Sequence, residues 1–176
     1  MAKINVLDKH TAELIAAGEV VERPSSAVKE LIENSIDSGA SAVTVEIKNG
    51  GSSFIRVSDN GSGIERDDIR NAFKRHATSK IKTSDDLDAI MTLGFRGEAL
   101  ASICAVAKVE LITKTADDPI GAKYEIEGGE ETYFDDAGGA QGTTIIVRDL
   151  FFNTPARRKF LKKDVSETNA VAAVIE

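Results

Sequence analysis

Apolar and polar residues alternate with a period of two in some segments of the chain and recur with a helical period in others. The alternating segments 43–48 and 53–58 flank Asn49-Gly50-Gly51, which is a signal for a β-hairpin. Further strands are expected at 108–115, 122–127, 131–134 and 143–149, and helices at 10–22, 25–37, 65–75 and 97–107. Because helices come early and strands recur as hairpins, the pattern predicts an α+β fold. It would be an α/β two-layer sandwich, with a mostly antiparallel sheet that carries helices on one face.

The length and composition fit one globular domain. The chain has 176 residues, of which 41% are hydrophobic and 29% are charged, which is ordinary for a soluble protein. The single cysteine, Cys104, cannot form an internal disulfide and lies in an apolar run, so we expect a core residue. No apolar run is long enough to cross a bilayer, and no signal-peptide pattern opens the chain. The sequence therefore predicts no membrane partner and an intracellular location, cytoplasmic or nuclear.

Charge is unevenly distributed along the chain. The formal net charge of −7 argues against indiscriminate nucleic-acid binding. Basic residues nevertheless gather at 66–82 and again at 157–163, and the segment 117–136 between them is acidic. These clusters are either solvated surface or patches that meet anions, and the sequence leaves both interpretations open. We expect only weak, salt-sensitive DNA binding without sequence preference.

The expected helix 25–37 carries an unusual polar stripe. One face holds Glu30, Glu33, Asn34 and Asp37 at helical spacing. Carboxylates stacked in this way repel each other unless a cation or a ligand rich in donors lies over them, although a solvated face remains the alternative. The opposite, apolar face is expected to hold Val28, Leu31, Ile32 and Ile36.

Two glycine-containing loops are further candidates for ligand binding. The loop 59–63, Asp-Asn-Gly-Ser-Gly, follows an expected strand, so its glycines could admit a ligand close to the backbone and Asp59 would be a pure acceptor. A tight polar turn is the alternative. The loop 94–97, Gly-Phe-Arg-Gly, opens an expected helix, where backbone N–H groups favour phosphate. The stretch 78–84 before it is basic and rich in hydroxyls, which is typical of a mobile lid.

The order of these motifs matches neither a P-loop nor a Rossmann fingerprint. A carboxylate-and-Asn helix, a D-x-G-x-G loop, a glycine-bounded lid and a late Gly-Thr strand at 142–144 together resemble the GHKL ATPases. That superfamily comprises gyrase B, heat-shock chaperones of the ninety-kilodalton class, histidine kinases and MutL. Within it, four strings resemble the MutL family of DNA mismatch-repair proteins, and they lie at 15–24, 75–80, 94–100 and 153–160.

The resemblance, which covers residues 4 to about 163, implies the GHKL (Bergerat) ATP-binding fold and a set of roles. Glu30 would be the general base, and Asn34 would bind Mg²⁺. Glu33 and Asp37 match the motif without a clear role. The remaining contacts to ATP would come from Asp59, Gly61, Gly63 and Thr143 near the adenine, and from Thr78, Ser79, Lys80, Gly94, Phe95, Arg96 and Gly97 near the phosphates.

The implied function is a Mg²⁺-dependent ATPase with slow turnover that serves DNA mismatch repair. ATP binding would drive homodimerisation of the full-length protein and signalling to mismatch-recognition and downstream repair proteins. In the family a lysine from a following domain reaches the γ-phosphate, so we expect 1–176 to be an ATP-binding fragment with weak activity. A nucleotide-gated scaffold without meaningful turnover is the main alternative. A histidine kinase is less well matched, since it would need an upstream phospho-acceptor helix.

Overall fold

The computed structural model describes residues 8, 21–74 and 99–175. The strands are β1 (Val43–Lys48), β2 (Phe54–Asp59), β3 (Lys108–Lys114), β4 (Gly121–Glu127), β5 (Glu130–Ala137) and β6 (Gly142–Arg148). The helices are α2 (Pro24–Asp37), α3 (Ile69–Ala72), α5 (Ala99–Val106), α6 (Pro155–Lys159) and α7 (Asp164–Ile175), with 3-10 turns η1 (Asn49–Gly51) and η2 (Arg66–Asp68).

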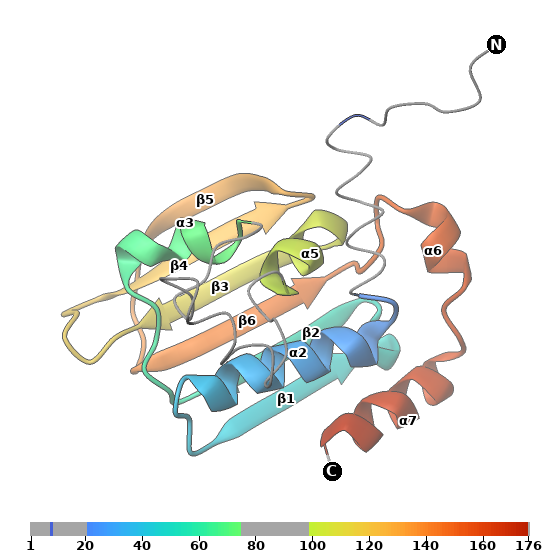
Figure 1. Cartoon of the computed structure of the whole chain (residues 1–176), viewed down its shortest axis with the longest axis horizontal. Helices are drawn as coiled ribbons and strands as arrows, with labels where there is room; N and C mark the ends of the chain where they lie inside the picture. Colours follow the sequence, from blue (N-terminus) through green and yellow to red (C-terminus); the bar gives the residue numbers. More distant parts are fainter. Residues whose placement is uncertain (1–7, 9–20, 75–98, 176) are drawn as a thin grey trace, which may run out of the picture.

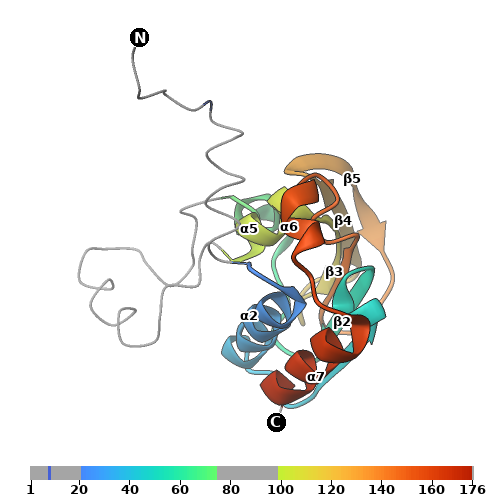
Figure 2. The same cartoon turned by 90° about the vertical axis from the view of Figure 1, so that its right-hand side faces the viewer.

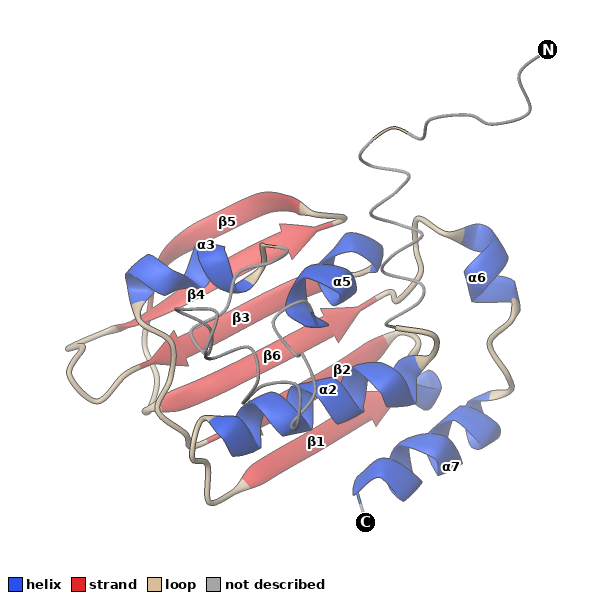
Figure 3. Ribbon diagram, in the orientation of Figure 1, coloured by secondary structure: helices blue, strands red, loops and turns tan. Residues whose placement is uncertain are grey.

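The strands form one six-stranded sheet in the order β1-β2-β6-β3-β4-β5, in which neighbouring strands are antiparallel. Helices α2, α3 and α5 lie on one face of this sheet (Figure 1, Figure 3). The predicted two-layer α+β fold is confirmed, and the expected hairpin is formed by β1 and β2 around η1. In the part of the chain that the structure describes, no helix is long and apolar enough to span a membrane.

The core lies between the helices and the sheet. Alternate strand residues, such as Ile55 on β2 and Leu111 on β3, point toward the helices and are fully buried. Leu31 of α2 and Ile103 of α5 pack in the same cluster, and Cys104 is a buried core residue as expected. Burial of such aliphatic side chains contributes about 1.5–3 kcal/mol each, so this face of the sheet is the main source of stability.

No described helix covers the opposite face of the sheet (Figure 2). This face carries charged side chains. Glu110 on β3 lies 2.7 Å from Lys123 on β4 and 3.5 Å from Arg148 on β6. Burial raises the pKa of Glu110, but its hydrogen bond to Lys123 and the two positive charges together outweigh burial. The net effect is a pKa below the ordinary value. The sheet is therefore amphipathic, with an apolar side beneath the helices and an ion-paired side away from them.

Helix α7 packs against the start of α2 and against η1. Arg23, directly before α2, donates to the buried Glu167 of α7 at 2.9 Å. A Cβ atom at Gly50, which has φ 68°, would lie only 2.8 Å from the Cβ of Glu167, so a glycine is required for this approach. Arg23, which belongs to the string 15–24, therefore has a structural role in holding α7.

Several expectations about local structure were wrong. The segment 65–75 was expected to be one helix, but its described part forms η2 followed by the single-turn α3. Ile36 was expected on the buried face of α2 and is 62% exposed, whereas Ser35 is only 3% exposed. Ser35 is turned inward because the strand end beneath it presents the polar carboxylate of Asp59, to which its hydroxyl donates. Helix α6 was not predicted, and β5 is longer than expected.

Candidate functional site

Asp59, at the end of β2, is the centre of a polar cluster. Its Oδ2 accepts a hydrogen bond from the hydroxyl of Ser35 on α2 at 2.7 Å. Its Oδ1 accepts from the backbone N–H groups of Gly61 at 2.9 Å and Thr143 at 3.2 Å. The bond to Gly61 closes a tight polar turn, which is the alternative that the sequence left open for this loop. The other two bonds join α2 and β6 to the same carboxylate. Asp59 is therefore held in one orientation by three parts of the chain.

Thr143 and Thr113 extend this cluster across the sheet. The strand register places Asp59 of β2 opposite Thr143 of β6, and Thr143 opposite Thr113 of β3. The two threonine hydroxyls lie 2.9 Å apart, and both residues are buried. The sequence motifs did not single out Thr113. The sequence did contain one indication of its role. Thr113 follows Val109 and Leu111 at alternate positions on the inward-facing side of β3, and it is polar whereas they are apolar.

The glycines of the cluster have a packing role in the structure. A Cβ atom at Gly61 would collide with the hydroxyl of Ser38. One at Gly63, where φ is 75°, would collide with the carbonyl of Lys114, and one at Gly142 with the carbonyl of Asp59. These glycines let the loop after β2 lie directly against the end of α2 and against β3. The contacts that require a glycine at these three positions are therefore made within the protein itself.

The polar stripe of the sequence lies on the described helix α2. Glu30, Glu33 and Asn34 are half-buried, and Asp37 is exposed. Ser35, adjacent to Asn34 in the helix, provides the direct link between α2 and Asp59. The expected phosphate contacts lie outside the described residues; these are Thr78, Ser79, Lys80, Gly94, Phe95, Arg96 and Gly97.

A small open pocket of about 120 Å³ adjoins the cluster on the β4 side of Thr113. Its walls are mostly apolar, with charged groups at Arg66 and Asp118. The sequence did not predict this pocket, because its residues come from three separate segments. Its lining consists of Ile64, Arg66, Thr113, Asp118, Pro119, Ile120 and Ala122.

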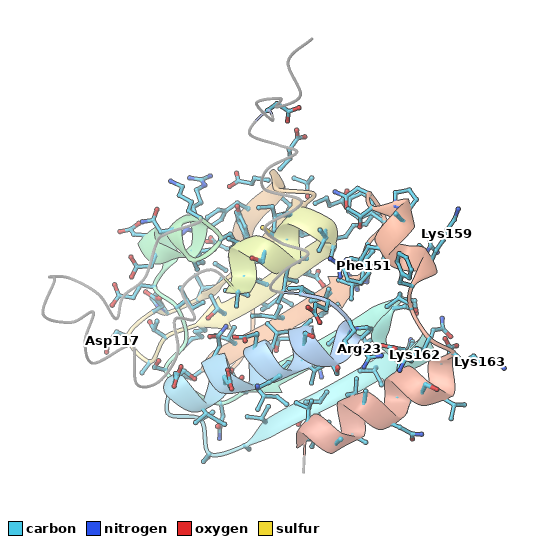
Figure 4. All side chains as sticks on the ribbon, turned by 45° about the vertical axis from the view of Figure 1, so that its right-hand side comes forward. Arg23, Asp117, Phe151, Lys159, Lys162 and Lys163 are labelled. Carbon is cyan, nitrogen blue, oxygen red and sulfur yellow. The ribbon has the colours of Figure 1, made fainter. Side chains whose placement is uncertain are left out.

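The two basic clusters have different surroundings. Arg66 and Arg70 pair with Asp136 and Glu131 of β5, and both guanidinium groups lie over the ring of Phe134. These two arginines of the first cluster are thus paired with acidic protein surface, whereas Lys74 of the same cluster is exposed. In the second cluster, on and after α6, Lys159 and Lys163 point away from the domain (Figure 4). Most of its basic side chains are exposed.

Comparison with known proteins agrees with this geometry. Residues 22–132 match the family model described as histidine kinase-, DNA gyrase B-, and HSP90-like ATPase. The DNA mismatch repair protein MutL of Agathobacter rectalis is 57% identical over 176 residues, which is 100% of this chain and 27% of that protein. MutL of Desulforamulus reducens is 55% identical over 175 residues, 99% of this chain and 27% of that protein. The chain thus spans about a quarter of the length of these relatives.

Two solved structures are also similar. One is the Aquifex aeolicus MutL ATPase domain complexed with ADP, with a TM-score of 0.69 and 36% identity over 89% of this chain and 54% of that one. The other is the N-terminal domain of a DNA repair protein, with a TM-score of 0.79 and 36% identity over 97% of this chain and 50% of that one. The chain therefore belongs to the histidine kinase-, DNA gyrase B- and HSP90-like ATPase family, within its MutL branch.

Proposed function

We propose that this chain is the ATP-binding domain of a MutL-type DNA mismatch-repair protein, with Asp59 recognising the adenine. The observation that carries the proposal is the fixed carboxylate of Asp59 at the end of β2, held by Ser35, Gly61 and Thr143. An ionised carboxylate only accepts hydrogen bonds, so it suits the exocyclic amine of adenine. The similar Aquifex aeolicus MutL ATPase domain was solved with ADP, which supports a nucleotide at this site.

Residues on α2 would act at the phosphate end of the same nucleotide. Asn34 lies one turn beyond Glu30, about 6 Å along the helix axis, so both side chains can reach one phosphate group. The amide oxygen of Asn34 suits Mg²⁺, which accepts a few protein oxygens besides phosphate and water, and the bound ion would neutralise phosphate charge. Glu30 would orient the attacking water and accept its proton. Thr78, Ser79, Lys80 and the amides of 94–97 are proposed as phosphate ligands.

At the level of the full-length protein, we propose ATP-dependent homodimerisation with slow hydrolysis. The dimer would signal to mismatch-recognition and downstream repair proteins. The MutL relatives support this assignment, but they are about four times longer than the chain, so further parts can contribute to turnover. A nucleotide-gated scaffold without meaningful turnover is the second candidate. Steady-state ATPase measurements on the full-length protein separate the two, because the scaffold would show no activity above background.

The nucleotide site itself is tested by calorimetric titration of the 176-residue chain with ADP and with a non-hydrolysable ATP analogue plus Mg²⁺. We expect saturable binding and very slow ATP turnover. Asp59→Asn keeps the side-chain shape but places an amide where three donors converge, so it should weaken ADP binding at least about tenfold. Asp117→Asn makes the same chemical change at an exposed position and should bind normally. Absence of nucleotide binding by the unmodified chain would refute the proposal.

A further inference from the structure

The buried hydroxyl of Thr113 makes three polar contacts. It accepts a hydrogen bond from the backbone N–H of Ile64 at 2.9 Å. It lies 3.1 Å from the carbonyl oxygen of Gly142 and 2.9 Å from the hydroxyl of Thr143. Thr113 is only 3% exposed, so water has little access to replace these partners. The three contacts join the loop after β2, the start of β6 and the side chain that neighbours Asp59.

Counting protons determines the direction of each bond. A hydroxyl has one proton and two lone pairs. The N–H of Ile64 takes one lone pair of Thr113, and the carbonyl of Gly142 can only accept, so it takes the proton. The contact with Thr143 must then use the second lone pair, which makes Thr143 the donor. In this arrangement all three contacts are satisfied, and the proton of Thr143 points toward Thr113.

The consequence is a cluster that offers acceptors to a ligand. With its proton committed to Thr113, the Thr143 oxygen retains only lone pairs, and the neighbouring Asp59 carboxylate is also an acceptor. Such a site favours an amino group and disfavours a carbonyl oxygen at the same position. A buried polar site of this kind discriminates strongly between analogues, because a mismatched group leaves its own and the protein's polar atoms unpaired.

We propose that Thr113 is a positioning residue that fixes the Thr143 hydroxyl as an acceptor and thereby makes the site select a 6-amino purine over a 6-oxo purine. This inference rests on the proposed nucleotide-binding function. Thr113 itself need not touch the nucleotide. Its effect is exerted through the orientation of Thr143 and through the loop after β2, which contains Gly63 and Ile64.

The test compares the affinities of ADP and inosine diphosphate, which differ at position 6 and in the proton at N1. Thr113→Val keeps the shape of the side chain but removes the hydroxyl, so the Thr143 proton is free to turn toward a ligand. We expect the ratio of ADP affinity to inosine diphosphate affinity to fall about tenfold by titration calorimetry. Thr113→Ser retains the hydroxyl and should keep the ratio within about twofold.

A matched control lies on the neighbouring rung of the sheet, one residue further along β6. Thr144 on β6 bonds to Ser58 on β2 at 2.8 Å through an equivalent pair of hydroxyls, but on the opposite face. Thr144→Val should leave both affinities unchanged. A purely structural role for Thr113 would weaken both nucleotides equally and leave their ratio intact, which would overturn the inference.

The possible failures are distinguishable. If the unmodified chain binds neither nucleotide, the proposed function is refuted, and so is this inference, because it rests on that function. If the chain prefers ADP and Thr113→Val keeps that preference, only the role of Thr113 is refuted. If Thr113→Val does not fold, Thr113→Cys replaces the hydroxyl with a weaker donor of similar size. A smaller fall in the ratio is then expected, and an unchanged ratio would again contradict the role.

Discussion

At the scale of single residues, one buried hydroxyl connects the two ends of the proposed site. Ser35 is only 3% exposed and donates to Asp59, while its neighbour Asn34 lies on the polar stripe of α2. Because a helix is rigid over one turn, the orientation of Asp59 and the positions of Glu30 and Asn34 are coupled through Ser35. The proposed adenine end and the proposed phosphate end of the site would therefore be positioned by the same helix.

Glu30→Ala and Asn34→Ala should fail in different ways in the full-length protein. Glu30 would act on the attacking water, which contributes to the transition state and little to ground-state affinity. Its loss should slow hydrolysis about a hundredfold or more while ATP affinity stays within about threefold. Asn34 would bind the Mg²⁺ that neutralises the triphosphate, so its loss should weaken Mg-ATP binding about tenfold. Titration and single-turnover assays measure the two effects.

Glu46→Ala is the matched control for these variants, because Glu46 is exposed on β1. It should leave both binding and hydrolysis unchanged. Equal losses of affinity in Glu30→Ala and Asn34→Ala would identify Glu30 as a binding or structural residue. Normal hydrolysis by Glu30→Ala would instead transfer the role of general base to Glu33.

At the scale of elements, the sheet is stabilised differently on its two faces. The helix-facing side buries aliphatic residues such as Ile55 and Leu111, whereas the other side concentrates charge around Glu110. Glu110 belongs to β3 and its cationic partners to β4 and β6, so this one carboxylate joins three adjacent strands. The ion-paired face therefore contributes to holding together the strands that carry Thr113 and Thr143.

The lowered pKa of Glu110 predicts a pH-dependent contribution to stability. Because the folded-state pKa lies below the ordinary value of 4.5, the contribution is present above that value and is lost as the pH falls through the folded-state pKa. Glu110→Gln should lower the free energy of unfolding at pH 7 by about 1–2 kcal/mol, and the difference should shrink under acid conditions. Urea denaturation at several pH values measures it. A change in the free energy of unfolding that does not depend on pH would contradict this explanation. An equally large change for Glu46→Gln would contradict it as well.

At the scale of the whole molecule, the described parts of the two basic clusters differ in their surroundings. The net charge of −7 repels nucleic acid in general, and Arg66 and Arg70 are neutralised by β5. The cluster on and after α6 is mostly exposed, with Lys159 and Lys163 directed outward (Figure 4). Any DNA contact by the described part of the chain is therefore expected at α6 and not at α3.

DNA binding should accordingly be weak and sensitive to salt. In fluorescence anisotropy with duplex DNA, joint replacement of Lys162 and Lys163 by Ala should lower the affinity and reduce the magnitude of the salt slope by about 1–2. Joint replacement of Arg66 and Arg70 by Ala also removes two positive charges but should have a much smaller effect. Tight binding that persists at high salt, or equal losses from the two pairs, would contradict the expectation.

The sequence by itself determined the α+β class, the first hairpin and Asp59 with Thr143 as site candidates. These features depend on local signals: alternation along a strand, glycines in a turn, and motifs of a few neighbouring residues. Glu30 and Asn34 were also placed together on α2 by helical spacing alone, and their roles stay predictions. The similarity to MutL ATPase domains agrees with what these local signals indicated.

Only the tertiary structure decided the roles of Ser35 and Thr113 and the difference between the two basic clusters. The apolar pattern of the sequence placed Ile36 on the buried face of the helix and gave no indication that Ser35 is buried. Ser35 faces inward because its hydroxyl donates to the carboxylate of Asp59, 24 positions later. Thr113 meets Thr143 because β3 and β6 are neighbours in the sheet although 30 positions separate them in sequence. Such contacts follow from strand order and register, which no local pattern encodes, because they arise only when the whole sheet is assembled.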